Sequence, residues 1–186
     1  MADYVNTLDL MSPEEAEDAV VSGLTELVEM RLSRIETALF EDDKTIKKAV
    51  FPVATDFSSY VFRDSAIEEL VLLAVGLGYG SISGCDKLRV LDICYGGSIG
   101  DAGSKLTALT TFVLRALAVV TLSNTKMLTD SPIANGTGYI YVPRSLVDDY
   151  QSATNWSTFA GQFRVLQDYT VDGTIDGELD RAKLGL

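Results

Sequence analysis

Apolar residues recur at a fixed interval in the middle of the chain. Four segments of the form apolar-x-x-apolar-x-apolar begin at equal intervals, at Ile46, Ile67, Leu88 and Leu109. This period of about 21 residues lies within the range of about 20 to 29 that is typical of leucine-rich repeats, in which every unit supplies one short strand and one return segment. The pattern therefore predicts an α/β-type repeat fold, a short leucine-rich-repeat solenoid of parallel strands over residues 44–137.

The apolar pattern gives each predicted strand two faces. The first, fourth and sixth positions are expected to point into the core, and the second, third and fifth positions to point outward. Parallel neighbours about 4.8 Å apart bring the outward positions of successive units into columns. The three columns are Lys47, Glu68, Arg89 and Thr110; Lys48, Glu69, Val90 and Thr111; and Val50, Val71, Asp92 and Val113.

The charged residues in these columns admit two interpretations. Opposite charges on adjacent strands can fix the register, each pair contributing only a fraction of a kcal/mol at an exposed site. Alternatively, the columns form a surface that contacts a ligand. The candidate binding face consists of Lys47, Lys48, Glu68, Glu69, Arg89, Asp92, Thr110 and Thr111.

Residues 1–43 are predicted to form an arm followed by an amphipathic helix. Ser12 fits the N-cap of this helix and Glu15 completes a capping box, and good helix formers continue to about Phe40. A heptad seam predicts a coiled-coil stem that oligomerises the chain, and the alternative is a helix packed against the first unit of its own solenoid. The candidate oligomerisation residues are Val21, Leu24, Val28, Arg31, Ile35 and Ala38.

Beyond Leu114 the period fades. A strand is expected at 139–143, where a proline stops it, and short helical turns at 146–153 and 156–163. An open solenoid end exposes a hydrophobic cross-section, so residues 138–167 are expected to form a C-terminal cap, followed by an acidic tail over 168–186. The cap aromatics are interpreted as core, with a sugar-stacking platform as the alternative: Tyr139, Tyr141, Tyr150, Trp156 and Phe159.

The predicted cap resembles that of BspA-like leucine-rich repeat proteins, which reads roughly IYVP-x-x-LV-x-x-Y-x-x-A-x-x-W-x-x-[YF]A. The matching residues are Ile140 to Pro143, Leu146, Val147, Tyr150, Ala153, Trp156, Phe159 and Ala160. The upstream units match more loosely, through Val61-Phe62 in one unit and Gly84-Cys85 in the next. The resemblance covers roughly residues 46–166 and implies a small parallel-strand solenoid.

Members of this family occur as adhesins on bacterial surfaces and as virion-associated proteins of gut bacteriophages and prophages. The chain differs from the adhesins because its N-terminus lacks the basic and apolar regions of a secretory signal, its repeats are few and its N-terminal region is predicted to be helical. The resemblance therefore implies a compact phage structural protein, assembled in the host cytoplasm and carried on the virion surface.

Composition narrows the function classes further. The 186 residues include 27 acidic and 15 basic side chains, a formal charge of −12, which makes nucleic acid and anionic membranes poor partners. No apolar stretch is long enough for membrane insertion. Histidine is absent, so a catalytic triad or zinc cluster is not expected, nor is any cofactor. Cys85 and Cys94 show no disulfide-scaffold pattern, and Cys85 is expected to be a buried, reduced thiol.

These observations favour a non-enzymatic virion structural protein, an oligomeric surface fibre or decoration. Its expected partners are copies of itself, a trimer among the candidate forms, other virion proteins, and a host cell-surface protein or polysaccharide. The alternative is a bacterial leucine-rich-repeat interaction or adhesion module outside a virion. An enzyme would require an acid pair such as Asp148 and Asp149 in a cleft, and nothing in the sequence places them in one.

Overall fold

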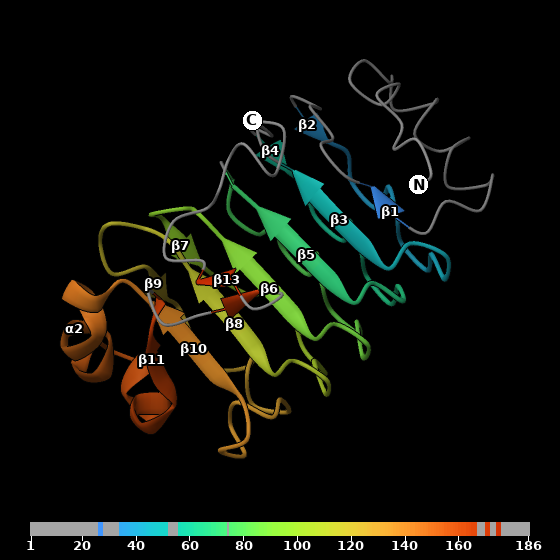
Figure 1. Cartoon of the computed structure of the whole chain (residues 1–186). Coiled ribbons are helices and arrows are strands. Elements are labelled where there is room, and N and C mark those ends of the chain that lie inside the picture. Colours follow the sequence, from blue (N-terminus) through green and yellow to red (C-terminus); the bar gives the residue numbers. More distant parts are fainter. Residues whose placement is uncertain are drawn as a thin grey trace.

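The computed structural model describes residues 26–27, 34–51, 56–73, 75–166, 170–171 and 174–175. Within them a seven-stranded sheet dominates, with α/β organisation, parallel strands and few helices (Figure 1). Its order is β1-β3-β5-β6-β8-β10-β11, and all of its strand pairs are parallel. The strands are β1 (Glu26–Leu27), β3 (Lys48–Phe51), β5 (Glu69–Leu72), β6 (Val90–Ile93), β8 (Thr111–Leu114), β10 (Tyr139–Val142) and β11 (Phe163–Val165).

The register of this sheet follows the sequence period. Ala49 pairs with Leu70, Leu70 with Leu91, and Leu91 with Phe112, so each step across the sheet equals one period of the sequence. The step from β8 to β10 is longer, because Phe112 pairs with Ile140. The parallel strands predicted from the period are therefore confirmed, and the fold is consistent with a repeat-like α/β architecture.

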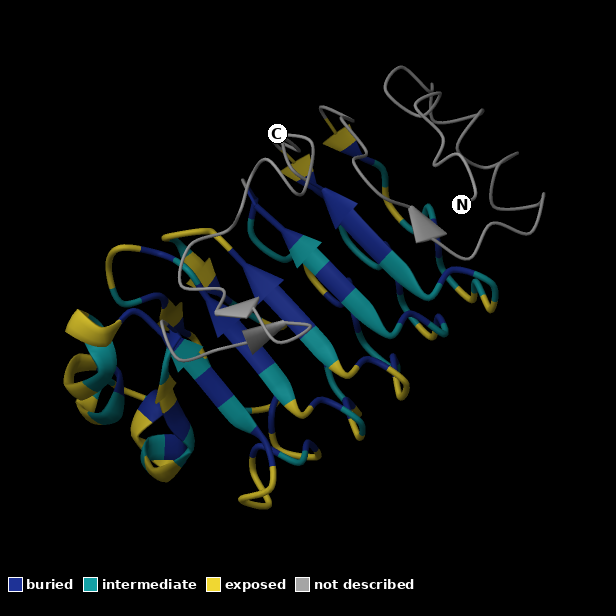
Figure 2. Ribbon diagram, viewed as in Figure 1, coloured by how far each residue is buried: buried dark blue, intermediate teal, exposed yellow. Residues whose placement is uncertain are grey.

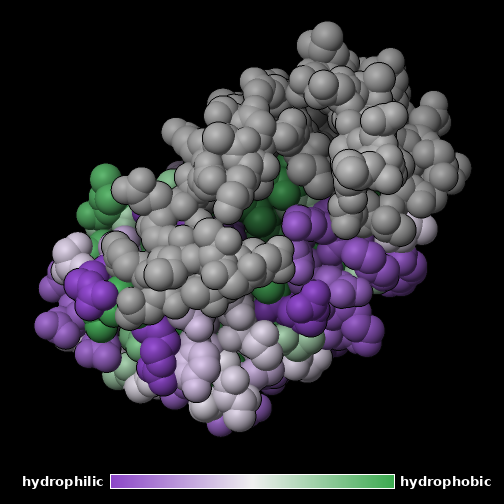
Figure 3. Space-filling view, in the orientation of Figure 1, coloured by the Kyte–Doolittle hydropathy of each residue, from purple (hydrophilic) through white to green (hydrophobic). Residues whose placement is uncertain are grey.

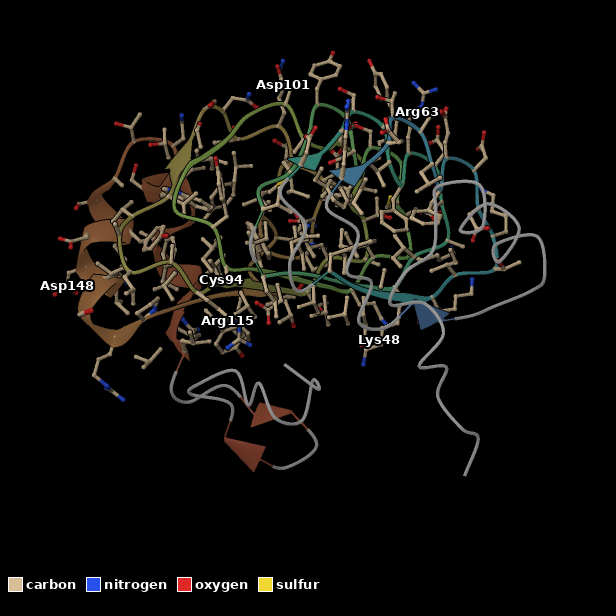
Figure 4. All side chains as sticks on the ribbon, turned by 90° about the horizontal axis from the view of Figure 1, so that it is seen from above. Lys48, Arg63, Cys94, Asp101, Arg115 and Asp148 are labelled. Carbon is tan, nitrogen blue, oxygen red and sulfur yellow. The ribbon has the colours of Figure 1, made fainter. Side chains whose placement is uncertain are left out.

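Two pairs of short parallel strands lie across the core from the large sheet (Figure 4). They are β2 (Arg34–Ile35) with β4 (Asp56–Phe57), and β7 (Ser98–Ile99) with β9 (Thr121–Leu122). A fourth sheet is an antiparallel pair, β12 (Thr170–Val171) with β13 (Thr174–Ile175). The apolar run 117–122 predicts a strand, and β9 forms its last two residues. The other two-residue strands do not follow from the apolar pattern.

Turns on the same side as the short strands stack on one another through backbone hydrogen bonds. Phe40 N donates to Val61 O at 2.8 Å, Phe62 N to Ser81 O at 2.7 Å, and Ile82 N to Ala102 O at 3.0 Å. We call the stacked segments 37–42, 59–64, 79–84 and 101–104 the turn ladder. Because these backbone groups are paired between successive units, the turns form an ordered surface opposite the sheet.

The core lies between the large sheet and the turn ladder (Figure 2). All twelve positions predicted to point inward are buried, because each strand stacks its apolar side chains on those of its neighbours. They are Ile46, Ala49, Phe51, Ile67, Leu70, Leu72, Leu88, Leu91, Ile93, Leu109, Phe112 and Leu114. Aromatic rings continue the stacking on the turn side, where Phe40 and Phe62 have ring centroids 4.9 Å apart.

The C-terminal helical turns lie against the last strands of the sheet. They are η2 (Arg144–Leu146), α2 (Val147–Ser152) and η3 (Trp156–Gln162). Tyr150, Trp156 and Phe159 are buried, which confirms their interpretation as core residues, whereas Tyr139 and Tyr141 are only partly buried. The strand β11, which follows η3 and pairs with β10, was not predicted.

The predicted N-terminal helix is wrong wherever the structure describes it. Glu26 and Leu27 form β1 and pair with β3, and Ile35 is buried in β2. Ala38 has a φ of 59°, in the left-handed region, so no right-handed helix passes through it. Apolar residues three apart suit a helix face, but they also suit this repeat, in which parallel pairing to a neighbouring unit decides the structure. The other predicted seam residues lie outside the described residues: Val21, Leu24, Val28 and Arg31.

Candidate interaction surfaces

The outer face of the sheet carries the predicted charge columns. Lys48 Nζ lies 3.4 Å from Glu69 Oε2, and Arg89 Nη2 lies 3.4 Å from both Glu68 Oε2 and Glu69 Oε1. These side chains remain partly exposed to solvent, so each pair adds little to stability. Figure 3 shows hydrophilic side chains gathered where β3, β5 and β6 begin. The sequence-predicted columns are therefore brought together in the expected register.

The remaining polar members of this face bind backbone groups or lie in the strands. Lys47 Nζ donates to Lys44 O at 3.1 Å, and Thr110 Oγ1 donates to Arg89 O at 3.3 Å. Thr111 begins β8 and pairs with Val90 across the sheet. These contacts support the interpretation that the columns set the register between units. A ligand-contacting role for this face stays a prediction.

Asp92 differs from the prediction because its side chain is buried. Arg115 holds it with two nitrogens: Nε lies 2.8 Å from Oδ1, and Nη2 lies 2.7 Å from Oδ2. The two side chains are only 9% and 7% exposed, and Val50 and Val113 of the same column are also buried. Arg115 lies in the loop after β8, outside the repeat pattern. The pattern therefore does not predict that Arg115 contacts Asp92. Asp92 is thus part of a buried ion pair and is not an exposed member of the candidate binding face.

A second polar surface lies on the turn ladder and was not predicted. Tyr60 and Tyr79 pack edge to face, with ring centroids 5.6 Å apart and an interplanar angle of 83°. The Arg63 guanidinium lies 4.4 Å from the centroid of the Tyr60 ring. Arg63 Nε also donates to Glu41 Oε1 at 2.7 Å, and this hydrogen bond raises the pKa of the Arg63 guanidinium. Tyr79 is 59% exposed.

The next unit extends this surface with a carboxylate. Gly80 N donates to the backbone oxygen of Asp101 at 2.7 Å, which places Asp101 beside the Tyr79 turn. Asn124 Nδ2 donates to Asp101 Oδ1 at 2.9 Å, and Lys126 Nζ lies 3.7 Å from the same atom. Figure 4 shows Arg63 and Asp101 pointing away from the core on the side opposite Lys48 and Arg115. We call Tyr60, Arg63, Tyr79 and Asp101 the turn-side surface.

One signal in the sequence could have located this surface. Tyr60 and Tyr79 are separated by nearly one period, so equivalent turns of adjacent units were bound to bring them together. The apolar pattern assigned both turns only to return segments, because it describes the core and ignores exposed aromatics.

The two cysteines are free and occupy different environments. Cys85 is buried, and its Sγ donates to Phe62 O at 2.8 Å, whereas Cys94 is exposed. Burial raises the pKa of the Cys85 thiol from its ordinary value of 9.0 to about 11, which keeps the sulfur in its unreactive protonated form. The expectation that Cys85 is buried is confirmed.

Acidic and cysteine side chains are the candidate chemical groups of this chain. In the part of the chain that the structure describes, no three histidine, cysteine or acidic side chains gather as a potential metal site. Asp148 and Asp149 are exposed in the first turn of α2. Within the same described segments, no helix has both the length and the apolar character needed to cross a membrane.

No protein-family model matches this chain, and no curated protein matches it.

Proposed function

We propose that the protein is a non-enzymatic bacteriophage virion structural protein, a surface fibre or decoration that presents a leucine-rich-repeat solenoid. The observation that carries this proposal is the parallel register of β3, β5, β6 and β8, which advances by one sequence period at each strand. A stack of similar short strands offers extended flat faces, which suit contact with other macromolecules. Such a fold supports binding more readily than chemistry within a cleft.

The packing of the C-terminal cap, residues 138–167, also supports the proposed function. The residues that resemble the BspA-like cap are the ones that close the core here, with Tyr150 and Trp156 fully buried. Tyr150 Oη accepts from Val120 N at 2.9 Å, and Trp156 Nε1 donates to Val120 O at 2.7 Å. The cap motif therefore has a structural reason in this chain, which favours the same short, closed repeat block that the resemblance implies.

The formal charge of −12 suits a protein carried in many copies at high local density, because like charge keeps the copies soluble. Copies of the chain, other virion proteins and a host cell-surface molecule are its proposed partners. A coiled-coil stem is not part of this proposal, because Ile35 lies in a strand and Ala38 in a turn. Light scattering of the full chain tests self-association, and a monomer would remove the homo-oligomer from the proposal.

Mass spectrometry of purified virions from the source culture tests the virion role. The expected result is that peptides of this protein co-purify with the particles through a density gradient and that immunogold labelling decorates the particle surface. Absence from the particles, together with presence in the cell fraction, would overturn the virion role. That outcome would favour the alternative, a bacterial leucine-rich-repeat interaction module outside a virion.

A further inference from the structure

We propose that the turn-side surface binds a neutral polysaccharide through the ring of Tyr79. The inference deepens the proposed function and depends on it, because it names the partner class that a displayed repeat block would contact at the host surface. Four side chains from adjacent turns carry it: Tyr60, Arg63, Tyr79 and Asp101.

The first argument is the exposure of an aromatic ring. Among the described residues, the large hydrophobic side chains left exposed are Tyr79, Tyr95 and Leu117. Tyr79 is 59% exposed although it belongs to an ordered turn, so much of its ring faces solvent. A pyranose ring presents a face of C–H groups, and an aromatic face packs well against such a surface while the phenol stays hydrated.

The second argument is that Tyr79 is held in place. Its edge-to-face neighbour Tyr60 is fixed between Arg63 and Gly80. A Cβ atom on Gly80 would lie 2.6 Å from the Tyr60 ring, and Gly80 has a φ of 61°, so only glycine allows this close approach. Because Glu41 in turn holds Arg63, the platform exists before a ligand arrives and little side-chain entropy is lost on binding.

The turn after Tyr79 supplies a polar group, the side chain of Asp101. The Asp101 carboxylate lies in the adjacent turn and is oriented by Asn124 and Lys126. A carboxylate accepts hydrogen bonds from paired hydroxyls, the groups that rim a sugar ring and give it directionality. An exposed aromatic ring, with an oriented carboxylate in the adjacent turn, therefore offers the two kinds of contact that a sugar unit takes.

The charges of the protein favour a neutral polysaccharide over an acidic one as its ligand. Two cations of these turns are paired with carboxylates, Arg63 with Glu41 and Lys126 with Asp101. The whole chain carries a formal charge of −12, which repels a polyanion. These charges favour an uncharged polymer of hexoses over an acidic one.

Affinity gel electrophoresis of the full chain tests this inference. Native gels containing dextran, laminarin, yeast mannan or galactan serve as neutral probes, and alginate serves as the acidic probe. We expect at least one neutral polymer to retard the wild type, Tyr79→Ala to weaken that association about 10-fold, and Tyr79→Phe to retain it. Tyr95→Ala is the matched control, since Tyr95 is another exposed tyrosine, whose ring instead packs near Gly76 and Gly97.

Asp101→Ala provides a second variant at an exposed side chain, and it is expected to weaken the same association while thermal unfolding stays unchanged. Equal retardation of the wild type and both variants would overturn the inference, as would retardation by alginate alone or by none of the four neutral polymers. Loss of cell attachment in Tyr79→Ala without any polymer binding would point to a protein partner and would also overturn it. Virion mass spectrometry is independent, so a virion protein that ignores these polymers refutes only this inference.

Discussion

At the scale of single residues, the Asp92–Arg115 pair interrupts an otherwise aliphatic column of the sheet. Its neighbours in the column are Val50, Val71 and Val113. Removing one partner of a buried ion pair is strongly destabilising, whereas replacing both by apolar residues is often neutral or stabilising. The pair therefore contributes to specificity of packing more than to net stability.

Arg115→Leu is expected to lower the free energy of unfolding by about 3 kcal/mol, because the Asp92 carboxylate stays buried without its guanidinium. Adding Asp92→Val, which continues the valine column, should restore most of that loss. Urea denaturation of both variants measures the effect, with Arg89→Leu as an exposed control. A single variant no less stable than this control would show that the pair is not effectively buried.

Cys85 gives the fold a pH dependence at alkaline pH. Its folded pKa of about 11 lies above its ordinary value of 9.0, so the unfolded chain loses the thiol proton first as pH rises. The stability contribution is complete below about pH 9 and is lost as pH rises towards 11, amounting to about 2 kcal/mol. Urea midpoints at pH 8 and pH 10.5 check this. The urea midpoint of Cys85→Ala should fall less between pH 8 and pH 10.5 than that of the wild type. An equal fall in the two midpoints would contradict the prediction.

At the scale of elements, polar side chains of the cap bind the backbone of β9 and of the residue before it. Tyr150 and Trp156 both bond to the backbone of Val120, and Asn155 Nδ2 donates to Leu122 O at 2.7 Å. These bonds join parts of the chain that are far apart in sequence. They fix helical turns that are too short to be stable on their own.

Tyr150→Phe is expected to lower the free energy of unfolding by about 1 to 2 kcal/mol, because the buried Val120 N–H loses its acceptor. Thermal and urea denaturation measure the loss. Tyr79→Phe removes a hydroxyl from an exposed ring and should change stability by less than about 0.5 kcal/mol. If the two variants were equally stable, the bond to Val120 would not fasten the cap.

Many of the strands could be predicted from the sequence, because the same apolar pattern recurs in each repeat. Strands β3, β5, β6 and β8 and their inward residues follow from it directly. The prediction of an N-terminal helix failed because Leu27 suits both a helix face and the strand that it forms beside β3. The two-residue strands β2, β4, β7 and β9 are too short to produce any alternation of their own.

The sequence predicted contacts of the candidate surfaces only between residues that lie one sequence period apart. Lys48 and Glu69 meet because the register puts them side by side. The burial of Asp92 depends on Arg115 in an irregular loop, and the turn-side tyrosines depend on a left-handed turn at Gly80. Contacts made by loops and turns carry no periodic signal, so the apolar pattern of the core does not reveal them.

At the scale of the whole molecule, neighbouring units make most of the contacts, and each unit lies on the next in the same register. A deletion of residues 67–87 removes one whole period and brings Leu88 into the position of Ile67. We expect this variant to stay folded with a lower melting temperature, since it retains both ends and all inward positions of the remaining units. Circular dichroism and thermal unfolding check this. Deleting residues 67–77 instead removes β5 but leaves the rest of its unit, so the unit is incomplete and cooperative unfolding should be lost.

The stacking of units along one axis also determines how the protein responds to force. A load applied to the two ends of the chain acts on one unit at a time, so the hydrogen bonds between strands break in succession rather than together. Each released period lengthens the chain by about 7 nm. We expect single-molecule extension to show a sawtooth of such steps, and one all-or-none rupture would contradict it. A protein of this kind would yield gradually under the drag of flow and extend before it breaks.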